Sequence, residues 1–238
     1  MKIPRHIGII PDGNRRWAKG RGLGAEEGYD YGLKPGLDLL RQAKACNIEE
    51  ITYYGFTVDN CKRPRIQQHA FHKACVDAVN LIAAEGTSLL VVGNTESQSF
   101  PKELLPYTKR TDINGGGIKV NFLVNYGWEW DLSNILNQDL TNTAIINTEI
   151  TNTEITKNEI INTKPEGKSV FSRLKSWDIS RVDLIIRWGN MRRLSGFLPL
   201  QAVYSDFYVV EEMWPDYSPK HFEQALDWYA KQDVTLGG

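Results

Sequence analysis

The segment His6–Trp17, which reads HIGIIPDGNRRW, decides the predicted fold. Its first five residues form a short apolar run of the kind that buried parallel strands show. The run leads to a carboxylate, Asp12, and then to Gly13 and Asn14, which both tolerate tight turns. Two arginines follow, where a helix is expected to begin. A buried strand that ends in a polar turn and a helix predicts an α/β chain.

Further apolar runs and helical patterns alternate along the rest of the chain. They predict strands at Glu50–Phe56, Ser88–Gly93, Ile118–Asn125, Val182–Arg187 and Asp206–Val210. Apolar residues at helical spacing predict helices at Gly36–Cys46, Gln68–Glu85 and Pro219–Gln232. We therefore expect one α/β domain over residues 1–238, with a mostly parallel six-stranded sheet flanked by helices.

Composition and charge exclude some functions. The formal net charge is −1, which argues against a protein that binds nucleic acid through overall positive charge. Three cysteines without a CxxC pair argue against a disulfide framework and against a zinc site. The chain shows neither a signal-peptide pattern nor an apolar run of transmembrane length, so a cytoplasmic protein is expected.

A tandem repeat interrupts the pattern. Residues 147–163 read NTEIT, NTEIT, KNEII and NT, with a period of five residues that fits neither a helix nor a strand. The composition is rich in Asn and Thr. We interpret residues 138–168 or so as a low-complexity insertion without chemistry, and the alternative is an irregular surface helix.

Polar and cationic residues follow four of the predicted strands. They lie in Pro11–Trp17, Phe56–Pro64, Asn125–Asp131 and Arg187–Gly196. Ligands of open α/β sheets bind beyond the carboxyl ends of the strands. The sequence therefore favours one site assembled from several strand ends over scattered surface charge.

The first of these segments combines the groups that bind a diphosphate. Backbone N–H groups, a helix start and two guanidinium groups suit the phosphates, and Asp12 can hold the Mg²⁺ that accompanies them. The alternative is a helix cap beside solvated arginines. Arg187, at the end of the strand Val182–Arg187, and Arg192 and Arg193 after it suggest a second phosphate group, or an exposed basic loop. Asp206, within a strand pattern, is either a metal ligand or an edge residue that faces solvent.

These residues resemble a known family, the cis-prenyltransferases or undecaprenyl diphosphate synthases. Four blocks carry the resemblance in the family's order and spacing: HIGIIPDGNRRWAKGRGL, FTVDNCKRP, VNYG, and DLIIRWGNMRRLSGFLPLQAVYSDFY with MWPD after it. They span nearly the whole chain except the repeat. The resemblance implies a parallel sheet with a hydrophobic tunnel, a homodimer, two prenyl diphosphate substrates and Mg²⁺. It also implies that any contact with a membrane is loose and made through the product.

The resemblance also implies roles for individual residues. Asp12 would bind Mg²⁺ and assist the chemistry, and Asp206, where the family usually has Glu, would complete the metal site across the dimer. Asn60 would lie near the reacting carbons with its neighbours Thr57, Val58 and Asp59. Diphosphate groups would be held by two sets of residues: Gly13, Asn14, Arg15 and Arg16, with Trp17 beside them and Arg63 near a phosphate, and Arg187, Arg193, Leu194 and Ser195 for the second substrate.

The chain departs from the family at several positions. Ala25 and Tyr29 stand where most members have Arg and His, which help to hold or protonate the allylic diphosphate. Cys61 replaces a Trp, Met191 replaces a Glu, and Trp188 replaces a small polar residue. The changes fall at the allylic and reaction-centre positions, and the arginines for the other diphosphate survive.

These departures leave alternatives open. Tyr29, Met191 and Pro199 resemble features of irregular, lavandulyl-type synthases on this fold, which join short prenyl units in branched fashion. Loss of the usual Arg and His also allows a non-catalytic partner subunit, although the intact opening motif argues against it. A binder of RNA is remote at this net charge. Gln68–Glu85 and Ile118–Val124 are candidate tunnel walls or ordinary core, with Phe122 or Val120 as residues that set the tunnel depth.

Overall fold

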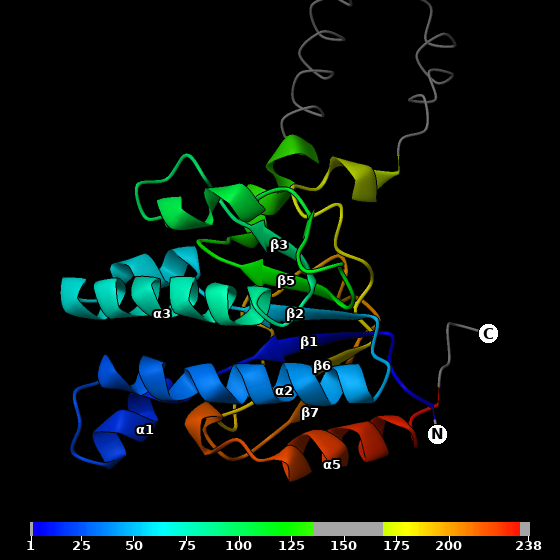
Figure 1. The fold of residues 1–238 in the computed structure, drawn as a ribbon, viewed down its shortest axis with the longest axis horizontal. Helices are drawn as coiled ribbons and strands as arrows, with labels where there is room; N and C mark the ends of the chain where they lie inside the picture. Colours follow the sequence, from blue (N-terminus) through cyan, green and yellow to red (C-terminus); the bar gives the residue numbers. More distant parts are fainter. Residues whose placement is uncertain (1, 136–168, 234–238) are drawn as a thin grey trace, which may run out of the picture.

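A seven-stranded sheet forms the centre of the structure, a computed structural model that describes residues 2–135 and 169–233 (Figure 1). The strand order is β4-β3-β5-β2-β1-β6-β7. All neighbouring strands are parallel except the antiparallel pair of β3 and β4. The strands are β1 (His6–Ile10), β2 (Glu50–Tyr54), β3 (Ser88–Val92), β4 (Thr111–Asp112), β5 (Lys119–Leu123), β6 (Leu184–Arg187) and β7 (Asp206–Val209).

The sheet confirms the predicted α/β class and all six predicted strands. Every side chain of the strands β1, β2, β3 and β6 is buried. For that reason their sequences show mostly apolar runs without the alternation of a half-exposed strand. The seventh strand, β4, was not predicted, because two residues at a sheet edge are too short to show a period. The predicted insertion at 138–168 lies outside the described residues.

Three helices cover one face of the sheet. They are α2 (Leu33–Ala45), α3 (Arg65–Ala83) and α5 (Pro219–Tyr229), and α2 and α3 run side by side across the strands in Figure 1. Their buried stripes, which include Leu39, Val79 and Phe222, pack against Ile51 and Val120 of the sheet. In the described ranges, no helix is long and apolar enough to cross a membrane.

Irregular chain covers part of the other face, and a helical segment at residues 128–135, which carries Trp130 and Asp131, covers another part. Ile179, Val182, Phe197 and Leu198 pack there against the strands. Asp131 holds part of this layer in place although it is almost fully buried. Its carboxylate accepts hydrogen bonds from the Tyr126 hydroxyl at 2.7 Å and from the backbone N–H and hydroxyl of Ser176 at 2.8 and 2.6 Å. A carboxylate with this many donors remains stable away from water.

The carboxyl ends of the central strands meet at one edge of the sheet. Ile10 pairs with Arg187, and Ile9 pairs with Tyr53, so β1, β2 and β6 end at the same level. The short helix α1 (Asn14–Gly20) begins just beyond this edge (Figure 1). The crossover from β1 leads to β2 on one side of β1, and the later crossover from β5 leads to β6 on its other side, and ligands of such sheets bind at this reversal.

A buried polar network lies at the opposite edge, at the beginning of the strands. The ring of His6 is almost fully buried, with Nε2 2.8 Å from the Thr52 hydroxyl and Nδ1 3.1 Å from the Ser180 carbonyl oxygen. Burial lowers the pKa of His6 from its ordinary value of 6.5, against the opposing charge of Glu50. The folded chain therefore holds this imidazole neutral over a pH range in which the unfolded chain protonates it.

We expect the free energy of unfolding to fall as the pH drops below about 6.5, by up to about 1.4 kcal/mol per pH unit for this one group. The sign follows because the unfolded chain binds the additional proton. The pKa of Glu50 is lowered from 4.5, so that its own contribution is lost only at more acidic pH. Urea titrations between pH 7 and 5 of the native protein and of His6→Gln measure the slope. Equal slopes in the two proteins would contradict the assignment to His6.

Candidate active site

A tight turn after β1 places the first acidic side chain. Gly13 has a φ of 103°, in the left-handed region, and its N–H donates to Asp12 Oδ1 at 2.6 Å. A Cβ on Gly13 would lie only 2.8 Å from that of Met213, so both the conformation and the space require glycine. The turn directs the Asp12 carboxylate, with 32% of the side chain exposed, towards the carboxyl edge of the sheet.

Arg187 at the end of β6 clamps the neighbouring loop and Asp12 together. Its Nη2 donates to Asp12 Oδ2 at 2.8 Å, while Nη1 donates to the Ser195 hydroxyl at 2.9 Å and to the Arg193 carbonyl oxygen. The residue is only 4% exposed, and its Nε has no hydrogen-bond partner. A buried guanidinium group with one unfilled donor and a single carboxylate partner suits an additional anion.

Two arginines of α1 reach the same area. Arg16 Nη2 donates to the Gly189 carbonyl oxygen at 2.8 Å and lies 3.7 Å from Asp12 Oδ1. Arg15 Nη1 donates to Gln67 Oε1 at 3.3 Å and is exposed. Arg16 thus has a fixed position over the turn, and Arg15 remains free to move towards a ligand.

Arg63 also lies near this area, where two aromatic side chains hold it in place. Its Nη1 donates to the Tyr29 hydroxyl at 2.9 Å, and its guanidinium carbon lies 5.2 Å from the centre of the Phe71 ring. The rings of Tyr29 and Phe71 stack at 4.5 Å. Burial lowers the pKa of Arg63 and raises the pKa of Tyr29, so the tyrosine is a neutral hydroxyl at physiological pH. Tyr29, which replaces the usual His, therefore orients a cation.

These side chains line one cleft of about 530 Å³. Most of the predicted site residues meet there: Asp12, Gly13, Asn14, Arg15, Arg16, Thr57, Asp59, Asn60, Arg63, Arg187, Arg193 and Ser195. Including Lys19, six cationic side chains face two carboxylates, so four positive charges are in excess. Such an excess in a concave site attracts anions strongly. The cleft has the charge that a diphosphate requires, and the individual roles remain predictions.

Four predicted residues do not reach this cleft within the chain. Trp17 is buried, and its indole Nε1 donates to Asp216 Oδ1 at 2.7 Å. Val58 packs beside Gly127, and Leu194 is partly exposed outside the cleft. Asp206 begins β7 and pairs with Leu184, which pairs with Ile7, so Asp206 lies about 10 Å across the strands from β1 and about 10 Å along them from Ile10, two residues before Asp12.

Sequence reasoning missed Tyr54 and Lys19, which also line the cleft. The Tyr54 hydroxyl donates to the Ser195 carbonyl oxygen at 2.7 Å and so supports the same loop as Arg187. Strand alternation could have shown that Tyr53 and Tyr54 face opposite sides of the sheet. No local pattern indicates which side carries the loop.

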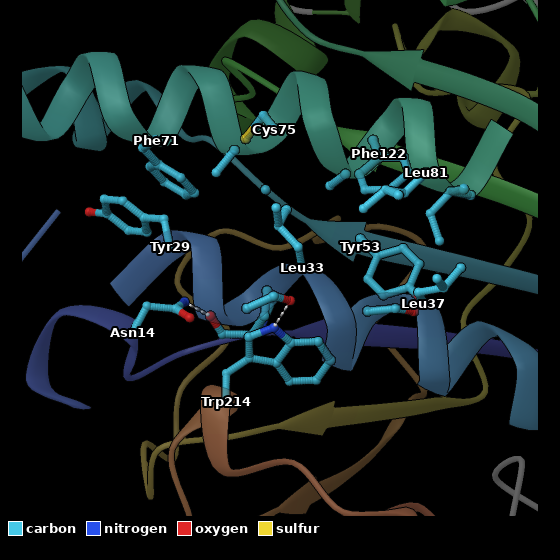
Figure 2. A pocket seen from close by; sticks show the side chains of 17 residues that line it. Asn14, Tyr29, Leu33, Leu37, Tyr53, Phe71, Cys75, Leu81, Phe122 and Trp214 are labelled. Atoms are coloured by element: carbon cyan, nitrogen blue, oxygen red, sulfur yellow. Dashed lines mark hydrogen bonds between the residues drawn. The ribbon is translucent and has the colours of Figure 1, made fainter. Parts of the chain in front are cut away.

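An apolar pocket of about 80 Å³ adjoins the cleft. Five residues line both spaces, so one opens into the other: Pro11, Asn14, Tyr29, Gly55 and Phe71. Figure 2 shows Tyr29, Phe71 and Asn14 at one end of the pocket, and Tyr53, Phe122, Leu37 and Leu81 towards the other, between α2 and α3. An anion cleft that opens into an oily pocket suits a ligand with a charged head and a hydrocarbon tail.

Known proteins resemble this chain over its whole length. The family described as putative undecaprenyl diphosphate synthase matches residues 10–237. The chain belongs to this family. A ditrans,polycis-undecaprenyl-diphosphate synthase, (2E,6E)-farnesyl-diphosphate specific, from Yersinia pseudotuberculosis is 30% identical over 242 residues, which cover all of this chain and 91% of that protein. An isoprenyl transferase from Streptococcus pneumoniae is 29% identical over all of this chain and 93% of its own length.

A solved structure shows the same fold. Lavandulyl diphosphate synthase from Lavandula x intermedia, in complex with dimethylallyl diphosphate, superimposes with a TM-score of 0.77 and covers 99% of both chains, at 20% identity. Membership of the undecaprenyl diphosphate synthase family confirms the expectation that this chain is a prenyltransferase, an enzyme that transfers alkyl groups other than methyl. The match also confirms the cis-prenyltransferase fold.

Proposed function

We propose that this member of the undecaprenyl diphosphate synthase family joins an allylic prenyl diphosphate to isopentenyl diphosphate with the help of Mg²⁺. The observation that carries the proposal is the opening of the cationic cleft into the apolar pocket at Tyr29 and Phe71. The cleft takes the diphosphate groups, and the pocket takes the hydrocarbon chain. The activities named for the relatives support this assignment.

The side chains of the cleft fit a magnesium ion that takes some of its ligands from the protein and the others from the substrate's phosphates. In the described part of the chain, no three His, Cys, Asp or Glu side chains gather into a group that could hold a metal. Mg²⁺ is commonly held by one or two carboxylates together with substrate phosphates. Asp12 supplies one carboxylate among the cations of the cleft. The ion would stabilise the negative charge on the departing diphosphate.

The reaction requires one bond to break and one to form. The bond between C1 of the allylic group and the diphosphate oxygen breaks, and its electron pair leaves with the diphosphate. The double bond of isopentenyl diphosphate supplies the pair for the new carbon–carbon bond. The resulting cation then loses a proton to the released diphosphate, and the electron pair of the broken C–H bond re-forms a double bond. Arg16 and Arg63 would stabilise one diphosphate, and Arg187 and Arg193 the other. The apolar pocket would exclude the water that would otherwise quench the cation.

A homodimer would complete the metal site. Asp206 lies too far from Asp12 within one chain, so its proposed role requires the partner subunit. Several large apolar side chains are exposed near the start of β7 and in the chain that leads to β6, namely Trp177, Val203 and Tyr204. A contact between two copies would bury them.

Irregular condensation is a second candidate. Tyr29 and Met191, both departures from the family pattern, line the cleft where the reacting groups would lie. A changed wall can orient the acceptor differently, so that a branched product forms from two allylic molecules. The non-catalytic subunit is disfavoured by the intact grouping of Asp12, Arg16 and Arg187.

Product analysis tests the proposal. The purified chain is incubated with Mg²⁺ and five-, ten- or fifteen-carbon allylic diphosphates, with and without isopentenyl diphosphate, and the products are identified by mass spectrometry. We expect products that depend on isopentenyl diphosphate and disappear with EDTA. A branched ten-carbon product from dimethylallyl diphosphate alone would select irregular condensation. No product from any combination would overturn the proposed activity.

A further inference from the structure

The apolar pocket has a well-defined far end. Near the cleft, the stacked rings of Tyr29 and Phe71 form its entrance (Figure 2). Along the pocket lie Leu33 and Cys75, from opposite helices. At the far end, Tyr53 of β2 and Phe122 of β5 stand side by side with the tips of their rings towards the helices (Figure 2). A hydrocarbon chain that enters from the cleft meets these two rings.

This far end is held in place by three kinds of contact. Tyr53 and Phe122 are direct partners in the parallel register of β2 and β5. Their rings stack at 5.1 Å with an angle of 18° between the planes. The Tyr53 hydroxyl donates to the Gly36 carbonyl oxygen of α2 at 2.8 Å, so the ring is tied to the helix that covers the pocket. Moving the ring aside would leave a buried hydroxyl without its partner.

The volume of the pocket limits what it can hold. The space between entrance and far end is about 80 Å³. An apolar cavity of about 150 Å³ in another protein takes benzene, a ligand of six carbons. The pocket therefore suits about one five-carbon unit, and a fifteen-carbon chain would need both rings to move.

We propose that the enzyme takes a five-carbon allylic diphosphate in this pocket and that Tyr53 and Phe122 select against longer chains. The inference rests on the proposed function, because it names the allylic substrate of that same site. One condensation of the five-carbon group with a five-carbon acceptor gives a ten-carbon product, which exceeds the pocket and cannot be seated for another round. The chain thus differs from the relative whose name specifies farnesyl diphosphate.

Binding separates this inference from the proposed function. The probes are inorganic pyrophosphate and the thiolodiphosphates of dimethylallyl and farnesyl groups, in which sulfur replaces the bridging oxygen and slows ionisation. They are titrated calorimetrically into the full chain with Mg²⁺. We expect the dimethylallyl probe to bind at least 10-fold more tightly than the farnesyl probe. Tighter binding of the farnesyl probe would overturn the inference and leave the proposed function intact. No binding of any probe would overturn both.

Substitution of Phe122 tests the role of the far end of the pocket in turnover. We expect Phe122→Val to raise the ratio of kcat/KM for the ten-carbon allylic diphosphate over the five-carbon one by at least 10-fold, because it opens the pocket. Phe100→Val is the matched control, since Phe100 is buried in the same core and lines neither the pocket nor the cleft. Melting temperatures confirm that each variant is folded. An unchanged ratio in folded Phe122→Val, or an equal rise in Phe100→Val, would contradict the inference.

Discussion

Replacing Asp12 with Asn should reduce kcat/KM on the order of 10³-fold, because the variant loses the carboxylate placed between Arg16 and Arg187 in the cleft. Asp12 would be the protein ligand of the metal ion that accompanies the diphosphate, and the substitution would remove the charge of that ligand. The shape of the turn should survive, since Asn can still accept the hydrogen bond from the Gly13 N–H.

Binding of inorganic pyrophosphate distinguishes this role from general damage. Asp12 repels an anion, so metal-free pyrophosphate should bind the Asp12→Asn variant at least as tightly as it binds the native protein. Calorimetry in EDTA measures that affinity, and steady-state kinetics with Mg²⁺ measure turnover. Asp59→Asn is a matched control, because Asp59 lines the same cleft but pairs with exposed Lys62. Near-native turnover of Asp12→Asn would refute the assigned role.

Replacing Arg187 with Gln should lower both stability and activity. The guanidinium group holds Asp12, Ser195 and the Arg193 carbonyl oxygen, and Gln cannot reach all three. Breaking a buried ion pair costs about 3–5 kcal/mol, and the partial exposure of Asp12 reduces this to about 2–3 kcal/mol here. Because the loop would lose its position, we expect KM for isopentenyl diphosphate to rise by at least about 10-fold.

The Arg187→Lys variant separates charge from geometry. Lysine keeps the positive charge but lacks the planar fork that contacts two partners at once. Urea denaturation should show stability partly restored in Arg187→Lys, while KM for isopentenyl diphosphate remains raised. Full recovery of KM would show that the charge alone matters, and native stability of Arg187→Gln would disprove the clamp.

The elements of the fold could be predicted because burial leaves a local pattern. β1, β2, β3 and β6 are buried along their full length, and α3 repeats its apolar residues at the helical period. The order of the strands in the sheet could not be predicted, because the sequence does not show which strands are neighbours. For that reason the distance between Asp12 and Asp206 became known only from the structure.

The positive charge of the cleft could be predicted from the sequence, but not each of the residues that line it. Arg15, Arg16 and Trp17 are consecutive in α1, where each residue turns by about 100°, so three in a row cannot all face one ligand. Trp17 is the residue that faces away, towards Asp216. The hydrogen bond from Tyr54 to the Ser195 carbonyl oxygen joins residues 141 positions apart, and no local pattern reports such a contact.

The clamp between Arg187 and Asp12 has a consequence for the order of events in the catalytic cycle. Both oxygens of that carboxylate already accept hydrogen bonds, so the resting protein offers little affinity to a free divalent ion. Asp12 would therefore hold a divalent ion more readily when the ion comes with a pyrophosphate that the cations of the cleft also bind. Magnesium added without a diphosphate would then leave the resting protein nearly metal-free.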